Sequence, residues 1–297
     1  MKNVKVIATC FQRARIVEKT SLVGNPLGYF HHSQNFTSTK KIKNLFEFIL
    51  KFERNCDPGC EMDVIIVNND VGNTEGNRFL KSLDNQKIFR GRIKYLEREN
   101  SGMCFGAYSA AYKVFKNSYQ YFLFCEDDNI IYKKNYLKDG IDLFEKSEKC
   151  GFVPYVHSTK LAYPHRKILK LTQSESISCH GFLGLTSTYV LNKILDENGD
   201  LPFNNQLGEN YYKSIINGEI ALSLKIIRQG LKIFDFPKDA IMSEPAYDLM
   251  RGIQYKKWPN FIEKLKFYFK TFLYSIFSVN HTSLKIYYKF LVLIIKK

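Results

Sequence analysis

Short hydrophobic segments alternate along the chain with segments whose hydrophobic residues recur at helical spacing. Short apolar runs bounded by polar residues predict buried strands, whereas recurrence at i, i+3 and i+4 predicts amphipathic helices. We therefore expect helices at residues 40–52, 106–115 and 218–229, a polar loop at 11–38, and strands at residues 2–9, 63–67, 93–96, 121–125, 152–157, 181–189 and 231–234.

This alternation predicts an α/β protein in which helices cover both faces of a mixed, mostly parallel sheet. Ligands of such sheets bind at the carboxyl ends of the strands. Three expected strands end in polar or acidic residues, which are Thr9, the Asn68-Asn69-Asp70 group and the Glu126-Asp127-Asp128 group.

Hydrophobic content of 45% and charged content of 25% are ordinary for a globular protein, and we expect residues 1–250 to form one domain.

The character of the chain changes after residue 250. Residues 251–297 hold ten Lys/Arg and one acid, a net charge of +9 out of +15 for the whole chain. Their uncharged stretches are far shorter than the roughly 20 residues that span a bilayer. Basic, aromatic-rich amphipathic helices lie in the membrane interface, so we expect residues 258–297 to bind a membrane surface. Packing of these helices on the domain or on a partner is the alternative.

The cysteines and the N-terminus indicate a reducing compartment. There are seven cysteines, and the chain opens directly on an expected strand without a secretory signal. Cys56 and Cys60 flank a turn and could form half of a zinc site, but no second such pair stands elsewhere in the sequence. We expect reduced thiols in a cytoplasmic protein that is peripheral at the inner face of the plasma membrane.

Glu126, Asp127 and Asp128 are the first candidates for chemistry. Three successive acids at the end of a buried strand repel one another unless a cation offsets their charge. The outer two, Glu126 and Asp128, can face one Mg²⁺ or Mn²⁺ together, and such an ion completes its shell with substrate phosphates and water. A polar strand end in solvent is the alternative.

A family resemblance is carried by the run Tyr121-Phe122-Leu123-Phe124-Cys125-Glu126-Asp127-Asp128. It resembles the DxD strand of family 2-like, GT-A-fold glycosyltransferases of the bacterial surface-glycan type. The resemblance implies that Glu126 and Asp128 hold a metal and that Asp127 lies beside the donor nucleotide. It also places Thr9 and Arg13 at the donor, because the run from Ala8 to Arg13 stands where the family has Pro-Thr-x-Asn-Arg.

Two further segments are similar to the donor side of this family. Asn68 and Asn69, followed by Asp70, stand where the family's strand ends in two acids that read the base and ribose. An amide both donates and accepts hydrogen bonds, so base recognition remains possible, but the two asparagines leave open which base is preferred. Asn100, Gly102 and Gly106 resemble the Asn-x-Gly segment beside the donor pocket. Ordinary loop and helix-start residues are the alternative for the two glycines.

The acceptor side is implied by two later segments. The helix at 218–229 looks like the family's acid-pair helix, which places Glu219 at the catalytic base and puts Gly218 in place of the first acid. His180 and Gly181 line the acceptor side in the same resemblance. A glutamate that only complements the helix dipole is the alternative for Glu219, and a structural histidine is the alternative for His180.

Together these assignments imply transfer of a sugar from a nucleotide-sugar donor to a glycan or lipid-linked acceptor, as in lipopolysaccharide or capsule biosynthesis. Mn²⁺ or Mg²⁺ would screen the charge of the departing diphosphate. Glu219 would deprotonate the acceptor hydroxyl, which implies inversion at the anomeric carbon. A retaining route would need a second carboxylate, for which Glu209 and Glu244 are candidates.

Other classes share part of this pattern. A sugar nucleotidyltransferase also uses an α/β sheet with paired acids, but it would want a glycine-rich phosphate loop after the first strand, and residues 9–15 contain no glycine. A catalytically inactive GT-A scaffold, or a basic protein that binds membranes without turnover, is a further alternative. No nucleic-acid-binding motif is present, so we expect no nucleic-acid partner.

Overall fold

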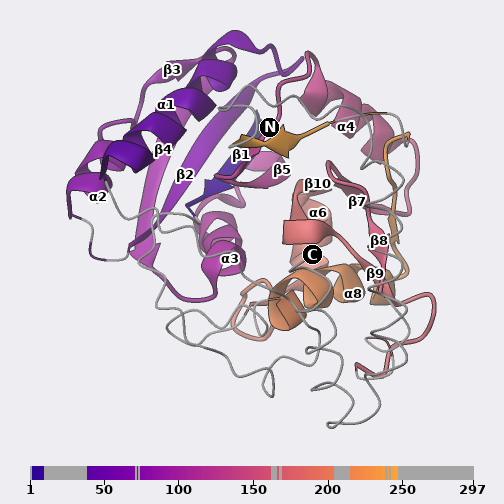
Figure 1. Cartoon of the computed structure of the whole chain (residues 1–297). Coiled ribbons are helices and arrows are strands. Elements are labelled where there is room, and N and C mark those ends of the chain that lie inside the picture. Colours follow the sequence, from indigo (N-terminus) through magenta and orange to yellow (C-terminus); the bar gives the residue numbers. More distant parts are fainter. Residues whose placement is uncertain are drawn as a thin grey trace, which may run out of the picture.

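The computed structural model describes residues 2–9, 39–70, 72, 74–161, 166, 169–203, 215–237, 240 and 242–246. The expected loop at 11–38 with Arg13, the basic segment 251–297 and Glu209 lie outside these residues. An eight-stranded sheet runs through the described part of the chain (Figure 1).

The sheet has the strand order β11-β7-β10-β5-β1-β2-β4-β3. β1 lies between β2 and β5 and is parallel to both, and β2 is parallel to β4. β10 is antiparallel to β5 and β7, and the edge strand β3 is antiparallel to β4. The predicted mixed, mostly parallel α/β sheet is therefore confirmed. Its strands are β1 Lys2–Ala8, β2 Met62–Asp70, β3 Lys87–Ile88, β4 Gly91–Glu99, β5 Tyr119–Glu126, β7 Cys150–Pro154, β10 Gly184–Ser187 and β11 Lys232–Ile233.

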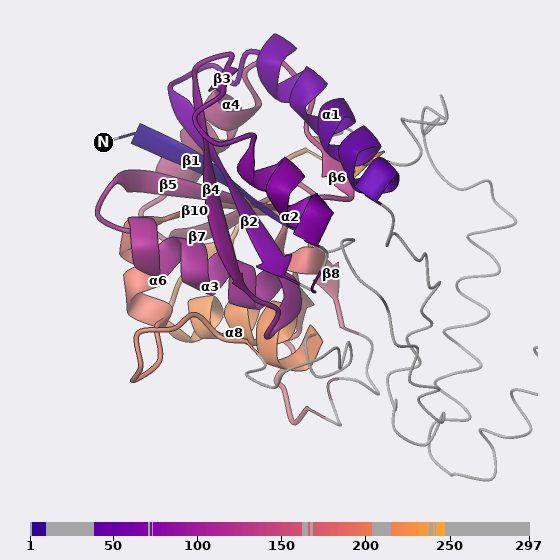
Figure 2. The ribbon, with the colours of Figure 1, turned by 90° about the vertical axis from the view of Figure 1, so that its left-hand side faces the viewer.

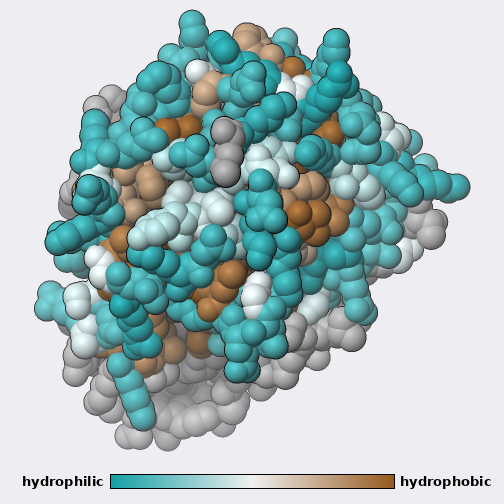
Figure 3. Space-filling view, turned by 180° about the vertical axis from the view of Figure 1, so that it is seen from behind, coloured by the Kyte–Doolittle hydropathy of each residue, from teal (hydrophilic) through white to brown (hydrophobic). Residues whose placement is uncertain are grey.

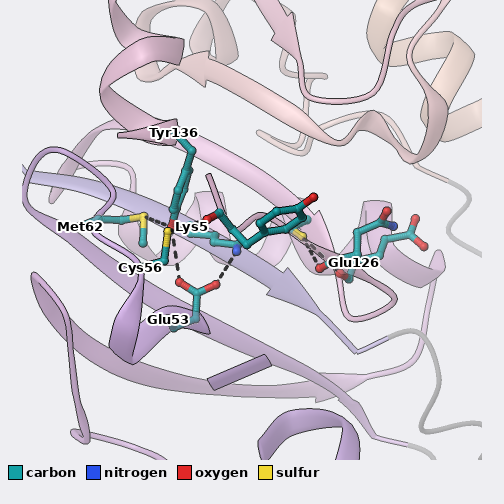
Figure 4. Close-up of polar contacts among 9 residues, drawn as sticks. Lys5, Glu53, Cys56, Met62, Glu126 and Tyr136 are labelled. Atoms are coloured by element: carbon teal, nitrogen blue, oxygen red, sulfur yellow. Dashed lines mark hydrogen bonds and ion pairs between the residues drawn. The ribbon is translucent and has the colours of Figure 1, made fainter. Parts of the chain in front are cut away.

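Helices cover both faces of this sheet (Figures 1 and 2). One face carries α1 (Thr39–Asn55), α2 (Thr74–Lys81) and α4 (Tyr136–Glu145), and the other carries α3 (Met103–Phe115), α6 (Thr188–Ile194) and α8 (Ala221–Arg228). Successive side chains of a strand point to opposite faces. Lys5 of β1 accordingly reaches Glu53 of α1 (Figure 4), while Phe124 of β5 packs against Tyr108 of α3, with ring centroids 4.5 Å apart.

Several predicted elements differ from the structure in their bounds. The prediction that the second strand stops at Val67 is wrong, because Asn68, Asn69 and Asp70 continue the parallel pairing of β2 with β4. The expected strand at 181–189 is wrong in its first part, since His180–Phe182 forms a 3-10 turn before β10. Polar residues can continue a strand when their backbone pairs with a neighbouring strand. Hydrophobic periodicity in the sequence does not show which residues are paired in this way.

The strand order defines one topological switch point in the sheet. Among the long parallel strands, β4-β2-β1-β5 is the order third, second, first, fourth, so the winding reverses between β1 and β5. Open α/β sheets bind ligands at this switch point, outside the carboxyl ends of the strands. Thr9 follows β1 there and Glu126 ends β5. The acidic turn found in the sequence therefore lies at the position where this topology binds ligands.

Shorter elements extend the carboxyl edge. β6 (Asn129–Ile130) pairs with β12 (Glu244–Pro245), and β8 (Thr159–Lys160) pairs with β9 (Ile177–Ser178), which leads into the turn His180–Phe182. A π-helical stretch, Ile215–Ile220, precedes α8. The helix expected at 218–229 therefore begins in this stretch and becomes α-helical only at Ala221.

The surface seen from behind is mainly hydrophilic, with hydrophobic patches separated by polar side chains (Figure 3). The large hydrophobic side chains that are exposed in the described part are Phe89, Val114, Tyr132 and Tyr189. Single exposed hydrophobic residues of this kind are normal for a folded domain. Of the helices that the structure describes, none has the length and apolar character to cross a membrane.

Candidate functional site

The three acids after β5 alternate in exposure. Asp127 is 1% exposed, whereas Glu126 and Asp128 are both partly exposed. The backbone N–H of Asp127 donates to the carbonyl oxygen of Ala8 at 3.1 Å, which ties the acidic turn to the end of β1. Glu126 and Asp128 are therefore the two carboxylates that solvent and a ligand can reach.

Carboxylates such as Glu126 and Asp128 are the ligands that a hard divalent cation prefers. Mg²⁺ is usually held by one or two protein carboxylates, with water and substrate phosphates filling the other positions. Within the described residues no group of three or more His, Cys, Asp or Glu side chains gathers as a metal site, so an ion here would depend on the substrate for part of its shell.

Cys56 and Cys60 are free thiols, and the Sγ of Cys56 donates to the carbonyl oxygen of Tyr132 at 3.1 Å.

Glu126 and Glu219 meet at the turn His180–Phe182. An ideal Cβ added to Gly181 would lie 3.0 Å from Oε1 of Glu126, so this carboxylate rests against the Gly181 backbone. The backbone N–H of Gly181 donates to Oε2 of Glu219 at 2.9 Å, and the hydroxyl of Ser178 donates to Oε1 of Glu219. Two acids that the sequence analysis singled out, 93 residues apart in the chain, thus flank one glycine.

Gly218, in the place of the family's first acid, has a packing reason. A Cβ on Gly218 would lie 2.3 Å from Cγ of Phe105, which belongs to the first turn of α3. A carboxylate has no room there, so of the two acid positions that the resemblance implies, only that of Glu219 carries an acid in this chain. Glu219 itself is 9% exposed and stands in the π-helical stretch, a local form that is frequent at functional sites.

Thr9, Asn68 and Asn69 lie together, buried, where β1 and β2 meet. The backbone N–H of Asn69 donates to Oγ1 of Thr9 at 2.9 Å, and its side-chain Nδ2 donates to the Thr9 carbonyl oxygen at 3.1 Å. Nδ2 of Asn68 donates to Oδ1 of Asn77 at 2.8 Å and to the hydroxyl of Tyr95 at 3.0 Å. A nucleotide would contact these amides only by replacing such internal bonds.

Arg98 belongs to this corner, although the sequence analysis did not single it out. Its guanidinium donates to Oδ1 of Asn69 at 2.7 Å and to the carbonyl oxygen of Ser101 at 2.8 Å. Burial is the main influence on the Arg98 guanidinium and lowers its pKa. Arg98 therefore ties the end of β2 to the start of α3. In the sequence it stands between two glutamates, a pattern typical of a solvated strand end.

The glycine-containing segment before α3 packs around Arg98. Gly102 precedes α3 with a φ of 70°, in the left-handed region that favours glycine. A Cβ on Gly106 would lie 2.0 Å from the carbonyl oxygen of Ser101 and 2.9 Å from a guanidinium nitrogen of Arg98. Oδ1 of Asn100 is buried without a hydrogen-bond partner in the described part of the chain. The left-handed backbone at Gly102 and the close packing at Gly106 thus explain why both positions are glycine.

Replacing Gly106 with alanine is expected to lower the free energy of unfolding by about 1–3 kcal/mol, because an added methyl group in a filled space displaces backbone and side chains. Urea denaturation of the purified protein measures this. Ala110→Ser, on a partly exposed position of the same helix, is the matched control, and its expected change is within about 0.5 kcal/mol. Equal stability of Gly106→Ala and the wild type would contradict the packing described.

Asp70, Asp128 and Glu244 are further predicted residues that the structure describes. Asp70 accepts a hydrogen bond from Nδ2 of Asn77 at 2.6 Å, so its carboxylate stabilises the start of α2. Oδ1 of Asp128 accepts from Nδ2 of Asn129 at 2.5 Å. Because β12 pairs with β6, the backbone of Glu244 lies beside Ile130, next to the acidic turn. Donor-side and acceptor-side candidates thus line the same edge of the sheet, on both sides of β5.

Comparison with known proteins gives distant structural likenesses. No family model matches the chain, and no curated protein matches it. Among solved structures, TarS of S. aureus aligns with 14% identity and a TM-score of 0.41, covering 81% of this chain and 36% of TarS. A cytidylyltransferase from Leptospira borgpetersenii aligns with 11% identity and a TM-score of 0.38, covering 80% of this chain and 76% of that one.

A proposed glucose-1-phosphate thymidylyltransferase from Bacillus anthracis aligns with 14% identity and a TM-score of 0.40, covering 88% of this chain and 97% of that one. This chain spans about a third of the length of TarS. By its strand order and the position of its acidic turn, the protein belongs to the broad class of Rossmann-like α/β folds.

Proposed function

We propose that the protein is a metal-assisted glycosyltransferase that takes its sugar from a nucleotide-sugar donor. One observation supports this most: the accessible acids Glu126 and Asp128 stand at the switch point of the sheet, and Glu126 lies against the turn that Glu219 holds. An anionic diphosphate needs a cation to bind next to two carboxylates, and a hard divalent cation meets that need. The resemblance of the strand to a DxD strand agrees with this assignment.

The proposed roles of the residues follow from their places. Glu126 and Asp128 would hold Mn²⁺ or Mg²⁺, which when bound supplies positive charge for the leaving diphosphate. Thr9, Asn68, Asn69 and Arg98 maintain the shape of the donor corner through their mutual hydrogen bonds. The turn at Gly181 forms the boundary towards the acceptor. The role of Glu219 as general base remains a prediction from the resemblance.

The donor class can be tested by thermal unfolding of the full chain with UDP, GDP, CDP or dTDP, each with and without Mn²⁺. One nucleotide at about a hundred times its dissociation constant is expected to raise Tm by roughly 5–10 °C, and only when Mn²⁺ is present. Mn²⁺ alone and nucleotide with EDTA are the controls. A protein that no nucleotide stabilises under either condition would refute the donor site.

A second assay separates sugar transfer from nucleotidyl transfer, which would use the same crevice. Transfer of sugar releases a nucleoside diphosphate from a nucleotide sugar, whereas nucleotidyl transfer releases pyrophosphate from a nucleoside triphosphate and a sugar 1-phosphate. We expect the first product and not the second, because the sequence after β1 lacks a glycine-rich phosphate loop. Pyrophosphate release in the presence of a sugar 1-phosphate would overturn the assignment.

We further propose that the acceptor is a lipid-linked glycan and that residues 258–297 bring the protein to an anionic membrane. Each Lys or Arg near such a surface contributes roughly 1 kcal/mol to binding, and segment 251–297 has a net charge of +9. Flotation of the full chain with anionic and with neutral liposomes tests this. Binding is expected to the anionic vesicles alone, and a protein that stays unbound with both would contradict it.

A further inference from the structure

Both carboxylate oxygens of Glu219 accept hydrogen bonds from groups of the protein itself. Oε1 accepts the hydroxyl hydrogen of Ser178, and Oε2 accepts the backbone N–H of Gly181 at 2.9 Å. With its side chain nearly buried, both carboxylate oxygens face the segment that joins β9 to β10. The carboxylate is thus engaged by donors at both of its oxygens, and each of these donors belongs to one short stretch of chain, residues 178–181.

That stretch adopts an uncommon backbone conformation. Gly181 has a φ of 59° and Phe182 a φ of 51°, and a left-handed conformation is costly for a bulky residue such as phenylalanine. The ring of Phe182 is fully buried and stacks on Phe152 with centroids 4.0 Å apart. The backbone N–H of Phe182 donates to the carbonyl oxygen of Cys179 at 2.8 Å. Surrounding contacts therefore hold the turn in a form that it would not adopt alone.

The turn His180–Phe182 contacts Glu126 through Gly181. Since Oε1 of Glu126 lies 3.0 Å from where a Cβ of Gly181 would be, a shift of this backbone by an ångström would move or release the Glu126 carboxylate. Glu219 accepts the N–H of the same residue. Glu219 therefore holds Gly181, and Gly181 limits the position of the Glu126 carboxylate.

We infer that Glu219 is a positioning residue, which holds the turn His180–Phe182 against Glu126, and is not the general base. The inference rests on the proposed function and refines it, because the resemblance would make Glu219 the base. A glutamine can replace Glu219 as a positioning residue, since its oxygen can accept from Gly181 and its NH₂ can donate to the hydroxyl oxygen of Ser178. Glutamine cannot replace it as a base.

Glu219→Gln and Glu219→Ala test the inference in the full chain. We expect Glu219→Gln to lower kcat by no more than about tenfold, since neutral hydrogen bonds are weaker than charge-assisted ones, and to keep the acid limb of the pH–kcat profile. Glu219→Ala is expected to lower kcat by about a hundredfold, as misplacement of a supporting group by an ångström can do. A loss of a hundredfold or more in Glu219→Gln, with the acid limb abolished, would identify Glu219 as the base and overturn the inference.

Amide hydrogen exchange keeps the inference testable even if the protein does not transfer sugar. The segment 178–182 is expected to exchange at least tenfold faster in Glu219→Ala than in the wild type, with Glu219→Gln in between, because exchange reports the loss of local hydrogen bonds. Unchanged protection in Glu219→Ala would show that Glu219 does not hold the turn. Failure of the nucleotide-binding assay with the expected exchange pattern would refute the function and leave the positioning role intact.

Discussion

Replacing Asp128 with asparagine is expected to lower the rate of sugar transfer by roughly a hundredfold or more, because a neutral amide holds a divalent cation much less strongly than a carboxylate does. The size of the side chain is kept, and its oxygen can still accept the hydrogen bond from Asn129. The fold should therefore survive. Transfer rates measured across a Mn²⁺ titration, with the donor identified by thermal unfolding, give the comparison with the wild type.

The matched control is Asp142→Asn on α4, where the carboxylate is 51% exposed and pairs with Lys138 on the surface. This variant removes the same charge from a place outside the site, and its transfer rate should stay within twofold of the wild type. The assignment of the acidic turn would be refuted by an Asp128→Asn protein that transfers sugar at the wild-type rate with the same Mn²⁺ requirement.

The sheet and the acidic turn could be predicted from the sequence because both depend on local pattern. Strands β1, β2 and β5 are buried on both faces, so their apolar residues form continuous runs. The carboxyl ends of parallel strands lie at one edge, which places Thr9 near Asp127 without further information. Segment bounds were less predictable, since strand pairing extends β2 through Asp70.

The turn at Gly181 and the role of Arg98 could not be predicted in this way. The left-handed Phe182 is stable only because Phe152 and Glu219 hold it, and both lie at least 30 residues away in the chain. Arg98 is fixed by Asn69 of the neighbouring strand. Such contacts form only once the sheet has brought distant segments together, and hydrophobic periodicity carries no record of them.

The burial of Lys5 could not be predicted from the sequence either, since an apolar strand is not expected to contain a buried lysine. Its Nζ lies 2.5 Å from Oε1 of Glu53, with the two side chains 1% and 3% exposed (Figure 4). Burial by itself would lower the pKa of Lys5, but the attraction and hydrogen bond of Glu53 outweigh it, and the pKa is raised. The hydroxyl of Tyr136 also donates to Glu53, at 3.4 Å. Lys5 is therefore a buried cation that depends on one carboxylate.

Replacing Glu53 with alanine is expected to lower the free energy of unfolding by about 3–5 kcal/mol, because it leaves the Lys5 charge buried without its partner. Urea denaturation measures the loss. The double variant Lys5→Met, Glu53→Leu removes both charges and keeps apolar volume, so it should be close to the wild type or more stable. The difference between the single and double variants isolates the cost of the unpaired charge.

A surface ion pair in the same protein tests whether burial causes the loss of stability that is expected for Glu53→Ala. Lys138 and Asp142 are also 2.5 Å apart, but their side chains are 55% and 51% exposed. Water solvates either charge when its partner is lost, so Asp142→Ala should leave the denaturation curve unchanged. If Glu53→Ala were as mild as Asp142→Ala, Lys5 would not keep a buried, unpaired charge, and the cost assigned to that charge would be contradicted.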